Sequence, residues 1–284
     1  MSLEKKDLGE MLETAIVAAR LAGQHAMEEM NYVKAVKKSE GELVTQADAQ
    51  CQRIIIQRIR ETYPDHGFIA EEGEKGRMFK RAPLVEPAIW WAIDPIDGTN
   101  NFAHGIPIFA VSVAALAEGE PVIGVVFQPA SDSMFTAVKG GEAQLDGRRI
   151  SAGEEEIGPL TSVGLDSHFN DTLPSWVCDL IRRSRFRNFG TTALHMAYVA
   201  RGGLAAAVVC TPKLWDIAAG TVLVEAAGGI TTDWKGRSLF PIDLDQYDGR
   251  SFQVLTANRK AHPRLVERMN AQPPFTAGPA PARR

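Results

Sequence analysis

One stretch of the chain joins a buried-strand pattern to clustered acidic residues: Ile89-Trp90-Trp91-Ala92-Ile93-Asp94-Pro95-Ile96-Asp97-Gly98-Thr99-Asn100. Its first five residues are apolar, and such a run predicts a β-strand that ends where Asp94 begins. Pro95 fixes the backbone φ angle, and a turn into a helical start aims the carboxylates of Asp94 and Asp97 at one point. Gly98 lets the backbone approach a ligand closely, and the helical start offers free N–H groups to an anion.

The charge around this stretch favours a metal site. No Lys or Arg occurs between Ala82 and Val138. Two close carboxylates without a cation repel each other or take up a proton, and carboxylate-rich sites suit magnesium or manganese. The alternative is a pair of turn aspartates exposed to water, which would be preferred for Asp-x-x-Asp alone. The neighbouring Gly98 and Thr99 favour the site.

Three further acidic residues stand beside predicted elements. They are Asp48 in Thr45-x-x-Asp48, Glu71 after Phe68-Ile69-Ala70, and Asp216 after Trp215. Each has an ordinary explanation, respectively a capping box, a surface acidic run and a helix N-cap. Their joint occurrence with the stretch above indicates one polar site built from several segments.

The composition of the whole chain limits the class of protein. The 284 residues are 45% apolar and 23% charged, which is typical of a globular protein and excludes a disordered or fibrous one. The net charge of −4 and the pI near 5.9 argue against nucleic acid as the main partner. The longest strongly apolar stretch, residues 105–117, is too short for a membrane span, and the N-terminus lacks a signal-peptide pattern. Cys51, Cys178 and Cys210 lack zinc-site spacing, which indicates reduced thiols and a cytoplasmic location.

Hydrophobic periodicity predicts helices over residues 4–30, 48–63, 173–182, 192–200, 215–227 and 263–270. Strands are predicted over 89–93, 109–116, 122–127, 134–138, 162–165, 205–210, 230–233 and 252–257. We expect the first four strands to be mostly antiparallel. The pattern predicts two packed halves of mixed α and β structure, residues 4–155 and 156–270, followed by a Pro- and Ala-rich tail, 271–284, that we expect to be disordered.

Signatures of other enzyme classes are missing from the sequence. The six histidines show no i, i+4 pairing and no Cys/His metal spacing, and only His104 follows the Asp94 stretch closely. Neither a Gly-x-Ser-x-Gly elbow nor a Walker-type Gly-Lys-Thr loop occurs.

Four strings together resemble the inositol monophosphatase family of magnesium-dependent, lithium-sensitive phosphatases. They are Glu42-Leu43-Val44-Thr45-x-x-Asp48, Ile69-Ala70-Glu71-Glu72, Trp91-Ala92-Ile93-Asp94-Pro95-Ile96-Asp97-Gly98-Thr99-x-Asn101-Phe102 and Trp215-Asp216-Ile217-Ala218-Ala219-Gly220. They occur in the family's order and cover about residues 8 to 270. The resemblance implies an α+β fold, the layered α-β-α-β-α sandwich of the inositol monophosphatase and fructose-1,6-bisphosphatase type, and a homodimer.

The resemblance also implies a ligand set for two or three Mg²⁺ ions. The implied metal ligands are Glu71, Asp94, the backbone carbonyl of Ile96, Asp97 and Asp216. Most of them lie in the half formed by residues 4–155, whereas Asp216 and the substrate contacts lie in 156–270.

Further roles follow from the same resemblance. Gly98 and Thr99 correspond to phosphate-binding N–H groups at a helix start, and Asp97 and Asp216 also border the substrate. Thr99 and Asp48, with Glu71, correspond to the catalytic residues that orient and deprotonate the attacking water.

One departure from the family concerns the substrate. Members that act on inositol phosphates usually carry a Glu six or seven residues before the Asp of the last string, and here Val209 and Cys210 occupy those places. We therefore expect only a weak preference for inositol 1-phosphate over compact esters. Asp166, His168 and Lys213 are candidates for other substrate contacts.

Taken together, the sequence predicts a metal-dependent phosphatase of small phosphate monoesters, inositol-1-monophosphatase-like, that uses a metal-activated water. Its partner would be a small phosphorylated metabolite, with no nucleic acid and no membrane. Alternatives within the family act on histidinol phosphate, sugar bisphosphates or 3′-phosphoadenosine nucleotides. An alternative of another class is a non-catalytic regulatory protein on this fold, which the intact carboxylates and Thr99 disfavour.

Overall fold

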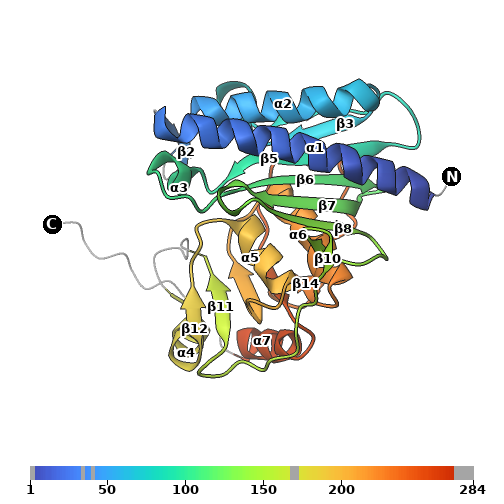
Figure 1. Ribbon diagram of the computed structural model, residues 1–284. Helices are drawn as coiled ribbons and strands as arrows, with labels where there is room; N and C mark the ends of the chain where they lie inside the picture. Colours follow the sequence, from blue (N-terminus) through green and yellow to red (C-terminus); the bar gives the residue numbers. More distant parts are fainter. Residues whose placement is uncertain (1–3, 33–35, 40–41, 167–172, 272–284) are drawn as a thin grey trace.

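The computed structural model describes residues 4–32, 36–39, 42–166 and 173–271. Within them the chain forms five layers, with helices on both faces of a large sheet and on both faces of a smaller one (Figure 1). The predicted α+β sandwich is therefore confirmed. The tail that we expect to be disordered lies, apart from Ala271, outside the described residues, as does His168.

The helices begin and end close to their predicted limits. They are α1 (Lys5–Glu29), α2 (Gln46–Thr62), α3 (Thr99–Ala103), α4 (Ser175–Arg183), α5 (Thr192–Ala200), α6 (Leu214–Ala226) and α7 (Ala261–Asn270). Short 3₁₀ turns occur at Met30–Tyr32, Glu74–Gly76 and Pro129–Ser131. Among the described residues, no helix combines the length and apolar character that crossing a bilayer requires.

The strands form three sheets. They are β1 (Val36–Ser39), β2 (Glu42–Val44), β3 (Gly67–Ala70), β4 (Phe79–Arg81), β5 (Ile89–Asp97), β6 (Ala110–Ala117), β7 (Glu120–Gln128), β8 (Ser133–Val138), β9 (Gln144–Leu145), β10 (Arg148–Arg149), β11 (Ser162–Leu165), β12 (Arg185–Arg187), β13 (Ala206–Val209), β14 (Ile230–Thr232) and β15 (Val254–Ala257). β1 and β2 pair only with each other as an antiparallel hairpin.

The large sheet has the strand order β10-β9-β8-β7-β6-β5-β3-β4. Consecutive strands from β5 to β10 pair antiparallel, which confirms the prediction for the first four of them, whereas β3 runs parallel to β5. β5 is longer than predicted and reaches Asp97, because pairing with β6 resumes at Asp97 after a break that follows Asp94. Every residue of β5 is buried, since helices cover both faces of this sheet, and its sequence therefore shows no polar alternation.

The small sheet has the order β12-β11-β13-β15-β14. β11 runs parallel to both β12 and β13, and β13 pairs antiparallel with β15. The sequence patterns did not predict β12, because its residues Arg185, Phe186 and Arg187 are all exposed. The parallel pairing brings the ends of β11 and β13 to the same edge, which faces the site.

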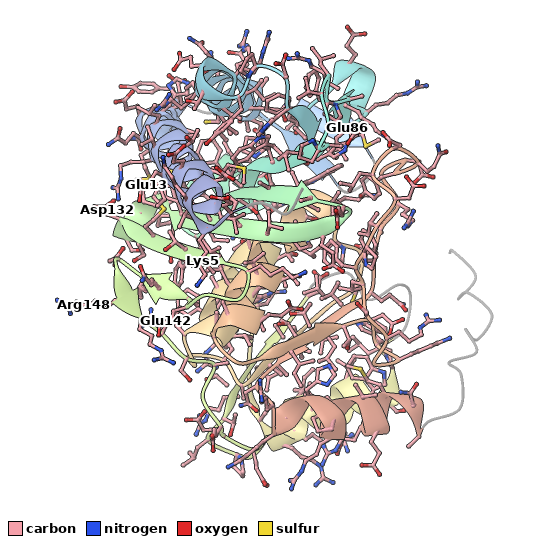
Figure 2. The ribbon with its side chains drawn as sticks, turned by 90° about the vertical axis from the view of Figure 1, so that its right-hand side faces the viewer. Lys5, Glu13, Glu86, Asp132, Glu142 and Arg148 are labelled. Atoms are coloured by element: carbon pink, nitrogen blue, oxygen red, sulfur yellow. The ribbon has the colours of Figure 1, made fainter. Side chains whose placement is uncertain are left out.

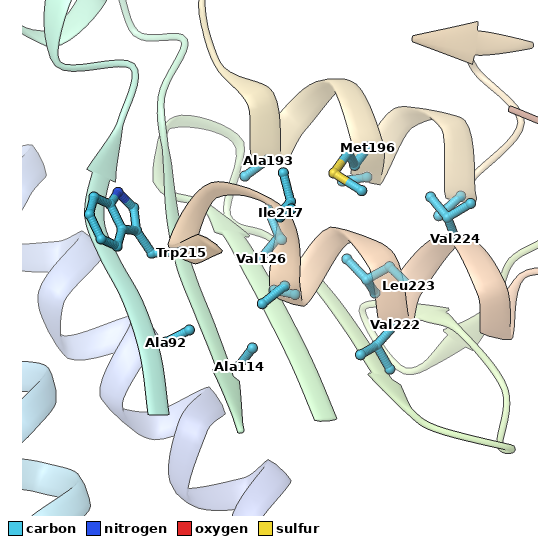
Figure 3. Packing of buried hydrophobic residues seen from close by; sticks show 14 of the residues in the cluster. Ala92, Ala114, Val126, Ala193, Met196, Trp215, Ile217, Val222, Leu223 and Val224 are labelled. Atoms are coloured by element: carbon cyan, nitrogen blue, oxygen red, sulfur yellow. The ribbon is translucent and has the colours of Figure 1, made fainter. Parts of the chain in front are cut away.

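Three apolar clusters hold the layers together. The first lies between α1, α2 and the outer face of the large sheet, and the third lies between the small sheet, α4 and α7. The central cluster fills the space between the sheets around α5 and α6, and Figure 3 shows Met196 and Leu223 from these helices within it. A Cβ at Gly220 would lie 2.6 Å from the Cβ of Met196, so glycine at this position permits the close approach of α5 and α6. Charged side chains such as Lys5, Glu13 and Arg148 lie on the outside (Figure 2).

Candidate active site

The end of β5 places Asp94 and Asp97 where the large sheet meets the central layer. Asp94 is 2% exposed and its Oδ1 accepts the Ile96 N–H at 3.0 Å. Gly98 follows with φ of 103°, and a Cβ there would lie 3.2 Å from the carbonyl oxygen of Ile108. Glycine is therefore required at this turn for both its backbone conformation and its lack of a side chain. α3 begins directly after it, at Thr99.

Asp97 is bound to the first turn of α5. Its Oδ2 accepts hydrogen bonds from the Thr191 hydroxyl and the Ala193 amide, both at 2.5 Å. Thr191 is also the N-cap of α5, since its Oγ1 accepts the Leu194 N–H at 3.2 Å. Burial raises the pKa of Asp97 to about 6 although these hydrogen bonds oppose the rise.

The predicted acidic ligands are brought together. Burial raises the pKa of Asp94 well above its usual value, and the neighbouring charges of Glu71, Asp97 and Asp216 raise it further. Burial followed by the charges of Asp97 and Glu71 likewise raises the pKa of Asp216. The carboxyl groups of Asp94 and Asp216 also share a hydrogen bond. Four acidic residues, located just after β3, in β5 and in α6, thus act on one another, and without a cation protons must relieve their repulsion.

This donor set fits a hard divalent cation. Among the described residues, no group of three or more His, Cys, Asp or Glu side chains is arranged so that it could hold a metal ion as it stands. Asp94 and Asp97 are nevertheless buried, Glu71 and Asp216 are half-buried, and all four are oxygen donors whose charges raise the pKa of Asp94 or Asp216. A magnesium-type cation neutralises such a group more completely than a shared proton.

Neighbouring backbone contacts hold the ligand-bearing segments. The Asp216 Oδ2 accepts the Lys213 N–H at 2.7 Å, which fixes the start of α6. The amide of Glu71 donates to the Ile93 carbonyl at 3.2 Å, beside the parallel β3–β5 pair. The Gln52 side chain bonds both the amide and the carbonyl of Glu72. These contacts position the segments that carry Glu71 and Asp216.

The two carboxylate oxygens of Asp48 form hydrogen bonds with different residues. Its Oδ2 accepts the Thr45 N–H at 2.8 Å and the Thr45 hydroxyl at 2.5 Å, which confirms the capping box at the start of α2. Its Oδ1 lies 3.1 Å from the Thr99 Oγ1, which also lies 3.0 Å from the Ile96 carbonyl oxygen. Burial raises the pKa of Asp48 to about 6 against the effect of the Thr45 bonds. Capping and contact with Thr99 are therefore compatible, because they use different carboxylate oxygens.

A pocket of about 690 Å³ opens beside these acids. Its lining includes Asp97 and Asp216 together with residues that the sequence analysis did not single out: Asn100, Asn101, Ile106, Ile108, Asn188, Phe189, Gly190, Thr191, Thr192, His195, Thr211 and Pro212. Local sequence signals for them are weak, because most come from loops and from the start of α5. The Asn101 side chain donates to the carbonyls of Ile108 and Phe189 at 2.7 and 2.6 Å, which closes the pocket between the two halves.

Of the residues that the sequence suggests for substrate contact, some line this pocket in the structure and others do not. Val209 is 1% exposed within the central cluster, and the Cys210 side chain lines a different pocket together with Asp233 and Phe252. The Lys213 Nζ donates to the Gly249 carbonyl at 2.7 Å. Lys213 does not line the pocket beside Asp97 and Asp216. Asp166 does line it.

The histidine that lines the pocket beside Asp97 and Asp216 is not the one that follows the Asp94 stretch in the sequence. His104 is exposed, its Nδ1 lies 2.8 Å from the Asn100 carbonyl oxygen, and it is not among the residues that line this pocket. His195 lines the pocket instead, because the fold brings α5 to the end of β5. Proximity in the sequence therefore did not identify the histidine of the site.

Comparisons with known proteins agree with this architecture. The family model described as the inositol monophosphatase family matches residues 7–273. The chain is 36% identical over 229 residues to "Fructose-1,6-bisphosphatase/inositol-1-monophosphatase" of Thermotoga maritima, covering 80% of this chain and 86% of that protein. It is 34% identical over 271 residues to "Nus factor SuhB" of Escherichia coli, covering 92% and 94%.

Solved structures give the same result. An IMPase of Thermotoga maritima superposes with a TM-score of 0.79 at 32% identity, covering 92% of this chain and 97% of that one. The extragenic suppressor protein suhB of Bartonella henselae superposes with a TM-score of 0.80 at 28% identity, covering 90% and 97%. The chain belongs to the inositol monophosphatase family.

Proposed function

We propose that the protein hydrolyses small phosphate monoesters, in the manner of an inositol-1-monophosphatase, through a metal-activated water. The observation that carries this proposal is that Glu71, Asp97 and Asp216 lie close enough to Asp94 to act on its carboxyl group, and that Asp97 and Asp216 line a pocket. Among the described residues that line this pocket there is no Lys or Arg to neutralise Asp97 and Asp216. Such a set of acids is costly to bury unless a cation is bound.

We assign the metal ligands to Glu71, Asp94, the Ile96 carbonyl, Asp97 and Asp216, which would hold two or three Mg²⁺ ions. When bound, the ions would lower the pKa of a water molecule and neutralise charge on the phosphoryl group. The fixed positions of Asp97 on α5 and of Asp216 on Lys213 support this assignment.

The proton acceptor in this proposal is the Thr99–Asp48 pair. The Thr99 hydroxyl donates to Asp48 Oδ1, so that its own oxygen remains able to accept a proton from an attacking water. Asp48 then takes the hydroxyl proton, and Glu71 helps to orient the water. The amides of Gly98 and Thr99 at the start of α3 would bind the phosphate.

A second candidate is a regulatory role without catalysis, and relatives named "Nus factor SuhB" are the observation that favours it. The buried acids of this chain favour catalysis, because a binding surface has no use for carboxylates that repel one another out of solvent. Lithium inhibition, homodimer formation and a cytoplasmic location stay predictions that the sequence makes.

A phosphate-release screen tests the proposal. Inositol, sugar, histidinol and nucleotide phosphates are offered with Mg²⁺ and with excess chelator. We expect release that requires Mg²⁺ for at least one class. Release that persists in chelator would contradict the metal mechanism, and no release from any ester would favour the regulatory role.

A further inference from the structure

The wall of the pocket beside Asp97 and Asp216 carries two polar side chains that the proposed mechanism does not use. Asp166 follows β11 directly, and His195 lies in α5. Both line the pocket, and Asp166 is close enough for its charge to act on the imidazole. Neither is among the predicted metal ligands or the water-orienting pair.

The position of Asp166 is fixed by the neighbouring strand. Its amide donates to the Val208 carbonyl at 3.1 Å, and its Oδ2 accepts the Cys210 N–H at 3.1 Å. The carboxylate therefore bridges the ends of two parallel strands. Val209, the last residue of β13, and Cys210, which follows it, carry no carboxylate. Asp166, directly after the adjacent strand β11, carries one.

One ring nitrogen of His195 accepts a hydrogen bond from the backbone. It is 2% exposed, and its Nε2 accepts the Phe189 N–H at 3.1 Å. Burial lowers its pKa to about 4, so the ring is neutral near pH 7. A neutral imidazole that accepts at Nε2 carries its proton on Nδ1. The Nδ1–H is thus the group that His195 can offer to an acceptor.

We propose that Asp166 and His195 are specificity-determining residues that select a monophosphate whose leaving group carries adjacent hydroxyls and exclude a second phosphate. This inference rests on the proposed phosphatase function. A hydroxyl group both donates and accepts, so neighbouring hydroxyls can donate to the Asp166 carboxylate and accept from the His195 N–H together. An ammonium group only donates, and it offers the imidazole N–H no acceptor.

A second phosphate is unfavourable at this wall for two reasons. First, the lining contains no Lys or Arg among the described residues, whereas Asp166 adds a negative charge. Second, the first amides of α5, which would otherwise attract an anion, are already engaged. Those of Thr192 and Ala193 bond Asp97, and that of Leu194 bonds the Thr191 hydroxyl.

Four substrates test separately whether the pocket selects adjacent hydroxyls and whether it excludes a second phosphate. Inositol 1-phosphate offers hydroxyls, p-nitrophenyl phosphate offers none, and fructose 1-phosphate and fructose 1,6-bisphosphate differ only in the second phosphate. We expect Asp166→Asn, which keeps an acceptor for the Cys210 amide, to lower kcat/KM for inositol 1-phosphate by about 10–100-fold. For p-nitrophenyl phosphate we expect a change within about threefold. The kcat/KM ratio of the bisphosphate to fructose 1-phosphate should rise by about tenfold, because a repelling charge is removed.

Two further variants sharpen the test. Asp166→Glu keeps the charge but shifts the oxygens, so it should lose activity on inositol 1-phosphate while still excluding the bisphosphate. Asp243→Asn is the matched control, because Asp243 is exposed and does not line this pocket, and it should leave the kcat/KM ratios of inositol 1-phosphate to p-nitrophenyl phosphate and of the bisphosphate to fructose 1-phosphate unchanged. An equal loss on all four esters in Asp166→Asn would overturn the proposal. An unchanged kcat/KM ratio of inositol 1-phosphate to p-nitrophenyl phosphate, or of the bisphosphate to fructose 1-phosphate, would do the same. If Asp166→Asn does not fold, Asp166→Ser replaces it with the same expectations.

A binding measurement keeps this test separate from that of the proposed function. Free myo-inositol, with Mg²⁺ and inorganic phosphate present, should raise the melting temperature of the wild type and of Asp243→Asn but not of Asp166→Asn. If the wild type cleaves no ester, the phosphatase proposal fails, and the melting temperatures still decide whether Asp166 binds hydroxyls. An equal shift in all three proteins would overturn the Asp166 assignment.

Discussion

The Asp97 carboxylate and the Thr191 hydroxyl form a buried hydrogen bond, with 2.5 Å between Oδ2 and Oγ1, although 94 positions separate them in the chain. Thr191 caps α5 with the same side chain. A predicted metal ligand at the end of β5 is thereby joined to the helix that carries His195. The bond fixes the acidic side of the pocket relative to the wall that we assign to the leaving group.

We expect Thr191→Val to lower the free energy of unfolding by about 1–3 kcal/mol, because a buried carboxylate loses a donor and α5 loses its cap. Urea denaturation in chelator measures this change without any contribution from bound metal. Thr191→Ser is the matched control and should stay close to the wild type, since it keeps the hydroxyl. Equal stability of the valine and serine variants would show that the bond contributes nothing.

The mutual repulsion of the acids predicts opposite effects of Asp94→Asn on stability and on turnover. Without metal, the variant should melt at the same or a higher temperature than the wild type, because asparagine relieves the repulsion without taking up a proton. With Mg²⁺, it should lose nearly all phosphate release and most of the thermal stabilisation that Mg²⁺ gives to the wild type. Asp243→Asn, at an exposed site, is the control. Full activity of Asp94→Asn would refute the ligand assignment.

The two hydrogen-bonding oxygens of Asp48 allow capping and catalysis to be separated by mutation. Thr99→Ala should reduce kcat by roughly 10²–10⁴-fold, the range typical of general-base loss, with little change in KM. Thr45→Ala removes a cap contact and should lower stability by about 1 kcal/mol with a much smaller effect on kcat. Thermal melting and steady-state kinetics on both variants measure the two effects. If Thr45→Ala lowers kcat as much as Thr99→Ala does, Asp48 acts through the position of α2 and not through Thr99.

His195 predicts a loss of stability in acid. The folded protein holds it neutral until the pH approaches its pKa of about 4, whereas an unfolded chain binds the proton near pH 6.5. Between these values the unfolded state binds more protons, so the free energy of unfolding falls as the pH is lowered. The contribution is on the order of 3 kcal/mol at pH 4.

Denaturant unfolding of the wild type and of His195→Gln at several pH values between 7 and 4 measures this effect. Burial also lowers the pKa of His66 and of His262, but both proteins contain these residues, so their effects cancel in the difference. The stability difference between the two proteins should shrink as the pH falls. A difference that does not depend on pH would contradict the buried neutral state of His195.

Much of the fold and most of the acidic site could be predicted from the sequence, because their signals are local. An apolar run before Asp94 predicts a buried strand that ends in a carboxylate, and Thr45-x-x-Asp48 predicts a helix start. The order of such strings along the chain predicted the family and its layered sandwich. The structure and the comparisons confirm both.

Only the tertiary structure decided what surrounds those acids. Thr191 and His195 reach the pocket because α5 packs between the sheets, and Asp166 reaches it because β11 lies next to β13 in parallel. Side chains alternate between the two faces of a strand, so residue spacing in the sequence does not reveal which side chain at the end of β13 faces the pocket. Carboxylates at strand ends are encoded by neighbouring residues, whereas the leaving-group wall depends on strand order and helix packing, which bring distant residues together.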